Sequence, residues 1–114
     1  MQGVFERYCS AIKKLSRLDY SENQITEDTE YKHGMVNVLD YSESRGGKSS
    51  KLTIIVEFAN LIDLSEVEID HLIIRGRANI VDLSESTIKK LDRRRLEAVH
   101  IDFSESTIEE DIYK

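Results

Sequence analysis

The chain is 114 residues long, which is the length of a single domain. A hydrophobic fraction of 39% and a charged fraction of 33% weigh against wholesale disorder. The net charge of -6 weighs against a nucleic-acid partner, because neutralising phosphates requires a surplus of cations. The one cysteine, Cys9, excludes an internal disulfide, and the lack of a signal peptide or a long apolar stretch predicts a cytoplasmic protein without a membrane partner.

The first residues have the pattern of an amphipathic helix. Its apolar residues fall on one helical face: Val4, Phe5, Tyr8, Ile12 and Leu15. We therefore expect residues 1–14 to form a helical cap over the end of the domain. A helix that binds a membrane surface or a partner is the alternative.

From there on, the motif apolar-Asp-apolar-Ser-Glu occurs five times, at steps of 21, 23, 19 and 20 residues. The copies begin at Leu18, Leu39, Ile62, Val81 and Ile101. An apolar residue stands four positions before every Asp. An isoleucine stands six positions after it in every copy except the second, which has Gly46. Repeats of this length indicate stacked units.

Each copy contains one short strand, because the residues flanking the Asp point to one side and the Asp points to the other. A unit of about 20 residues with one such strand cannot bury its apolar side alone. We therefore predict a mainly β fold, a short parallel β-solenoid of about five rungs. Residues 15–112 form the five repeats of a single domain, 1–114.

Two segments depart from the repeat. Residues 45–50 lie in the longest step, contain two glycines, and are expected to form a loop insertion. Residues 51–58 are rich in β-branched and aromatic side chains, which predicts a longer strand in the third rung.

The spacing Leu15-x-x-Leu18-x-Tyr20-x-x-Asn23-x-Ile25 resembles the leucine-rich-repeat consensus, and the units starting at Ala59, Ala78 and Ala98 follow the same spacing. The resemblance covers residues 15–112. It implies a curved solenoid with a parallel sheet on its concave side, used to bind other macromolecules, usually proteins. The family's asparagine ladder is represented only by Asn23. A closed β-helix and a non-solenoid α/β domain are the alternatives.

Stacking in register would place the repeated acidic residues in two columns. The aspartates form one column: Asp19, Asp40, Asp63, Asp82 and Asp102. The glutamates form the other: Glu22, Glu43, Glu66, Glu85 and Glu105. Unit charges ~5 Å apart repel by roughly 1–3 kcal/mol, depending on the effective dielectric constant. Either the aspartates accept hydrogen bonds from nearby Ser and Thr and organise the turns, or the columns bind a basic protein partner or divalent ions.

Positive charge gathers in the fourth and fifth units. Arg75 and Arg95 hold the same position relative to the Asp of their units, and Arg77 lies two residues further on. These three arginines are candidate partner-binding residues for an anion or an acidic partner, including the acidic columns of a second copy. The sequence therefore predicts a weak homo-oligomer, with an ordinary solvated face as the alternative.

Few residues point to chemistry. Gly47-Lys48-Ser49 resembles the end of a phosphate-binding loop, although Ser42 stands where the first glycine of that loop belongs. The histidines are far apart in the sequence, so no metal site is expected. We expect no cofactor and no catalytic residue.

These features predict a non-enzymatic protein-interaction or scaffolding module that binds a partner on its acidic sheet face. A self-assembling structural protein, whose rungs stack or pair between subunits, is the alternative. A small phosphate-binding or hydrolytic protein that uses residues 45–50 is a third possibility.

Overall fold

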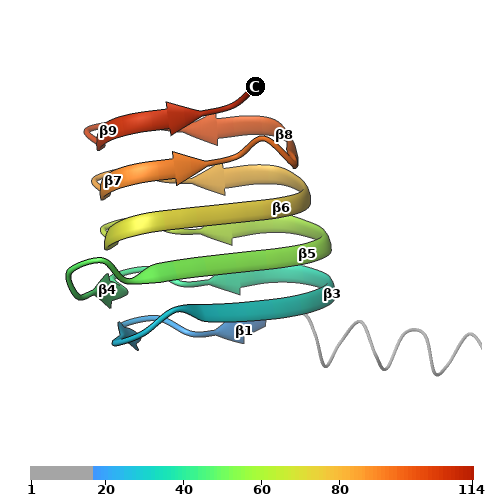
Figure 1. The fold of residues 1–114 in the computed structure, drawn as a ribbon. Coiled ribbons are helices and arrows are strands. Elements are labelled where there is room, and N and C mark those ends of the chain that lie inside the picture. Colours follow the sequence, from blue (N-terminus) through green and yellow to red (C-terminus); the bar gives the residue numbers. More distant parts are fainter. Residues whose placement is uncertain (1–16) are drawn as a thin grey trace, which may run out of the picture.

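The computed structural model describes residues 17–114, which form a parallel β-solenoid of about five rungs (Figure 1). The strands are β1 Arg17–Asp19, β2 Gln24–Ile25, β3 Thr29–Asp40, β4 Arg45–Gly46, β5 Lys51–Asp63, β6 Glu68–Asp82, β7 Thr87–Asp92, β8 Leu96–Asp102 and β9 Thr107–Ile112. The predicted mainly β solenoid is thus confirmed. Residues 17–114 contain no helix, and the helical cap predicted for residues 1–14 lies outside the described residues.

Every rung has strands on both of its sides. The turn that follows each motif Asp, called the motif turn below, joins the two sides at one edge. At the other edge β3, β5 and β6 bend and run on into the opposite side (Figure 1). All strand pairs are parallel. The motif aspartates pair in register from rung to rung, from Asp19 up to Asp102. The sequence motif therefore sets the stacking register.

The unequal repeat lengths are absorbed away from the motif turn. The step of 19 residues, from Asp63 to Asp82, is the shortest. In the second rung, three more residues lie between Gly46 and Leu52 than between the matching residues Ile69 and Leu72 of the third rung. This places the extra length of the longest step mainly at residues 47–51, which overlap the loop expected at residues 45–50, while Arg45 and Gly46 form β4. β5 begins at Lys51, as the β-prone segment predicted.

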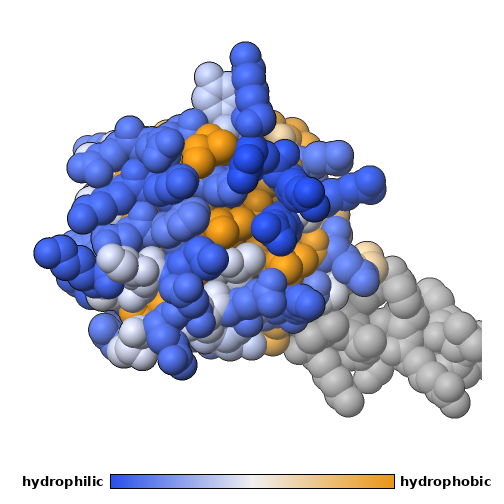
Figure 2. Space-filling model, viewed as in Figure 1, coloured by the Kyte–Doolittle hydropathy of each residue, from blue (hydrophilic) through white to orange (hydrophobic). Residues whose placement is uncertain are grey.

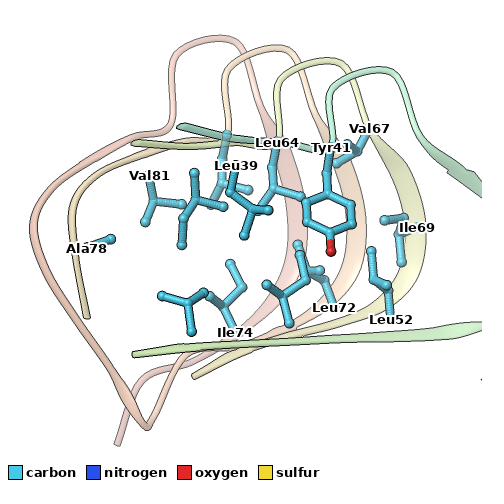
Figure 3. Packing of buried hydrophobic residues seen from close by; sticks show 14 of the residues in the cluster. Leu39, Tyr41, Leu52, Leu64, Val67, Ile69, Leu72, Ile74, Ala78 and Val81 are labelled. Atoms are coloured by element: carbon cyan, nitrogen blue, oxygen red, sulfur yellow. The ribbon is translucent and has the colours of Figure 1, made fainter. Parts of the chain in front are cut away.

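Columns of aliphatic side chains fill the interior. Leu39, Ile62 and Val81, which directly precede a motif Asp, are fully buried. Leu39 and Val81 face the other side of the rungs, where Leu52 and Leu72 are fully buried as well (Figure 3). Burying a side chain of this size stabilises the fold by roughly 1.5–3 kcal/mol. These columns therefore supply the main stabilisation of the stack.

Gly76 allows two rungs to approach closely at the bend. Its φ is 121°, a conformation that residues with a Cβ rarely adopt. A Cβ at this position would lie 1.8 Å from the backbone oxygen of Val56 in the rung below. A glycine is therefore required here, and its neighbour Arg75 is positioned by this bend.

Candidate acidic interface

The aspartate column organises the motif turns. In each of the five copies the amide of the Ser two residues later donates to the Asp Oδ1, at 2.9–3.0 Å. In three copies the Ser hydroxyl donates to the same oxygen: Ser42, Ser65 and Ser104. The two bonds from Ser104, from its hydroxyl and then from its amide, hold the pKa of Asp102 below its usual value. One oxygen of each Asp is therefore used within its own turn.

The turns also stack directly on one another. The amide of Tyr41 donates to the Asp63 carbonyl at 2.8 Å, and the amide of Glu43 donates to the Ser65 carbonyl at 2.9 Å. The same two bonds recur between the other successive rungs. Asp40 is 5% exposed and forms an ion pair with Arg17 at 2.8 Å. The aspartate column thus forms as predicted, but much of its hydrogen-bonding capacity is engaged inside the protein.

The glutamate column occupies an unusual backbone conformation. All five motif glutamates have a left-handed φ between 55° and 58°. This region is disfavoured by roughly 1–2 kcal/mol for residues other than Gly, and Asn or Asp is the usual exception. The same conformation in all five copies directs the five glutamates out of the same edge of the solenoid, and each of them is exposed.

The glutamates are close enough to influence one another. Repulsion from Glu66 raises the pKa of Glu85, and Glu105 adds to this effect from the other side. Within residues 17–114, none of the five motif glutamates is in an ion pair. The edge therefore carries an uncompensated line of negative charge, one carboxylate per rung at a spacing of about 4.8 Å.

The predicted arginines lie on the side of the rungs that follows the motif turn and on the bend beyond it. Gly76 pairs with Leu96, so Arg75 and Arg95 are neighbours on adjacent rungs, as their shared sequence position predicted. Arg77 pairs with Glu97 in register and forms an exposed ion pair with it at 3.4 Å. The structure thus brings Arg75 and Arg95 together and gives Arg77 a separate partner.

The remaining candidates are dispersed. In the described part of the chain, no three His, Cys, Asp or Glu side chains gather in a way that could hold a metal ion. The amide of Ser49 donates to Asp70 at 2.6 Å, so this amide of the 45–50 loop already has an anionic partner. Gly46 leaves room for Ser50, whose buried hydroxyl donates to the Ile25 carbonyl at 3.1 Å.

Comparisons with protein-family models, with curated proteins and with solved structures find no match for this chain. The solenoid is therefore established from its own geometry, and the leucine-rich-repeat resemblance gains no support from a family match. None of residues 17–114 belongs to a helix with the length and apolarity needed to cross a membrane.

Proposed function

We propose that the protein is a non-enzymatic interaction module that holds a positively charged protein partner along its glutamate column. The single observation that supports this proposal is the line of five exposed glutamates without ion-pair partners. The binding of macromolecules by a solenoid surface is also what the leucine-rich-repeat resemblance implies. The aspartate column contributes negative potential behind the glutamates while it maintains the turns.

The backbone supports this role of the glutamates. Gly or Asn in place of the five glutamates would relieve the backbone strain, because these residues adopt the left-handed conformation at little cost. Glutamate at all five positions instead keeps a carboxylate on a long side chain at each step of the column. A partner with lysines or arginines along one face would relieve the repulsion that raises the pKa of Glu85.

The proposal is tested with a lysine-rich peptide as the probe. The variant Glu43→Gln/Glu66→Gln/Glu85→Gln removes three charges from the middle of the glutamate column. The control Glu27→Gln/Glu57→Gln/Glu109→Gln removes the same charge from exposed positions elsewhere. Affinity is measured by isothermal titration calorimetry at low and at high salt, after circular dichroism has shown that both variants keep their β structure.

We expect the column variant to bind the peptide about tenfold more weakly at low salt, a difference of about 1.4 kcal/mol. The control should bind within about twofold of the original chain, and high salt should weaken all the complexes. If both variants lose the same affinity, net charge rather than the column governs binding, and the proposal is wrong.

A further inference from the structure

Arg75 and Arg95 form a pair of neighbouring cations. The amide of Gly76 donates to the Arg95 carbonyl at 3.0 Å, which joins the two rungs beside these residues. Both side chains are exposed. Strands of adjacent rungs lie about 4.8 Å apart, so the two positive charges repel each other unless an anion lies between them.

The pair differs from the other arginines of residues 17–114, each of which has a carboxylate partner. The ion pairs are Arg17–Asp40, Arg45–Glu68, Arg77–Glu97, Arg93–Asp111 and Arg94–Asp92. None of the ion pairs among the described residues includes Arg75 or Arg95. The chain has six more acidic than basic residues, so two arginines on adjacent rungs without a carboxylate partner are a distinct local feature.

The two arginines line a hollow of about 460 Å³ together with Asp92 and Arg94. Arg94 is fixed there, because its Nε and terminal nitrogen donate to the two oxygens of Asp92 at 3.0 and 2.8 Å. This side-chain bond lowers the pKa of Asp92 to about 2, so its carboxylate is ionised and engaged. The four lining side chains leave two positive charges in excess. Figure 2 looks onto the side of the solenoid that carries β7 and β9, which is largely hydrophilic with hydrophobic patches between the charged side chains.

We infer that this hollow, lined by Arg75, Asp92, Arg94 and Arg95, is a binding site for a phosphate group with two negative charges. The planar guanidinium groups donate in pairs to phosphate oxygens, which is the geometry that phosphate recognition uses. A doubly charged group matches the excess charge of the hollow and removes the repulsion between Arg75 and Arg95. This site is separate from the glutamate column and does not depend on it.

The test is a titration followed by ¹H–¹⁵N NMR at constant ionic strength, with inorganic phosphate in one arm and phenyl phosphate in the other. The variant Arg75→Gln/Arg95→Gln removes the unpaired cations. The control Arg45→Gln/Arg77→Gln removes two exposed arginines that have carboxylate partners, so both variants change the net charge equally.

Saturable shifts are expected around residues 75 and 95, with a dissociation constant of about 1 mM or tighter. The dissociation constant should rise about tenfold in Arg75→Gln/Arg95→Gln and stay within about twofold in the control. Tighter binding of phenyl phosphate would assign the site to an organic phosphate ester, and equal binding would assign it to the phosphate group alone. Shifts that do not saturate, or equal losses in the two variants, would overturn the inference.

Discussion

The first and last rungs of the described solenoid differ in the kind of polar side chain that covers the apolar interior. Tyr20 of the first rung stacks on Tyr41 of the second rung, with ring centroids 5.1 Å apart and an angle of 10° between the rings. The fully buried Tyr41 hydroxyl forms a hydrogen bond of 2.8 Å with His33 Nε2, and Asn23 donates to the Tyr31 hydroxyl at 2.9 Å. Neutral aromatic groups with polar tips therefore fill this end.

The last rung uses charges instead. Asp111 pairs with Leu91 in register and so occupies an interior column that the lower rungs fill with leucine. Arg93 donates two hydrogen bonds of 2.9 Å to its carboxylate. The Arg93 guanidinium also lies 5.4 Å from the ring centroid of Phe103 and 5.1 Å from that of Tyr113. An ion pair between aromatic rings thus covers the C-terminal end.

The difference bears on whether a further rung could pair with the last described one. β8 and β9 each have one edge without a neighbouring strand in the described structure, which is a template for a further rung. Charged side chains directed inward oppose such pairing, because a stacked copy would bury them. We therefore expect the C-terminal end to resist end-to-end stacking, the association on which a self-assembling structural protein would depend, and the three predictions below address this contrast.

The largest effect is expected from breaking the ion pair with Arg93→Met. The carboxylate of Asp111 would remain above the apolar interior without its partner. Loss of one partner of a fully buried pair costs about 3–5 kcal/mol, and the quarter-exposed position of Arg93 reduces this to about 2 kcal/mol. Urea unfolding followed by circular dichroism measures the change. A loss as small as that of the exposed control Arg77→Met would show that the pair does not stabilise this end.

Replacing both charges, by Arg93→Met together with Asp111→Leu, is expected to restore most of that stability. An apolar pair of similar size is often as stable as the ion pair it replaces. It also leaves the edges of β8 and β9 next to an uncharged interior, so concentration-dependent association should appear. Sedimentation velocity over a range of concentrations detects it. A double variant that remains monomeric would show that the inward charges are not what prevents stacking.

The sequence predicted the stacking register, and it missed the backbone conformation of the turns and the features that occur once. The Asp-Ser spacing fixed the turns and the register, because the same hydrogen bond closes every turn. The left-handed glutamates could not be predicted, since this residue type rarely adopts that conformation. A signal for the C-terminal ion pair was present: Asp111 stands nine residues after its motif Asp, where two earlier copies have Leu72 and Leu91.

The opposite side of the rungs was predicted only in part. Beyond the recurring isoleucine, the segments after the motif turn differ in length and composition, so they show no common pattern from which a second set of strands follows. The register shift between Val56 and Ala59 and the longer connection from Asp92 to Leu96 add residues at different places in different rungs. Counting forward from a motif Asp therefore loses the register at the bend, whereas counting back from the next motif Asp keeps Arg75 and Arg95 as neighbours. The hollow that these two arginines line with Asp92 and Arg94 becomes visible only in the structure.

The smallest effect concerns pH and the aromatic end. Burial lowers the pKa of His33, so the folded protein, in which the imidazole bonds to Tyr41, favours the neutral form of this side chain. In the unfolded chain it binds a proton near pH 6.5. The unfolded state then holds more protons, and the free energy of unfolding falls as the pH decreases from about 6.5 towards the lower folded-state pKa.

Urea unfolding between pH 7.5 and 5, values chosen to bracket the histidine pKa range, should show a shallower decline in the free energy of unfolding for His33→Gln than for the original chain. His71, whose pKa burial also lowers, is expected to contribute to the decline that remains. His100→Gln, at an exposed position of the last rung, serves as the control for the loss of a histidine. An unchanged decline in His33→Gln would mean that the hydrogen bond to Tyr41 does not couple this end of the solenoid to pH.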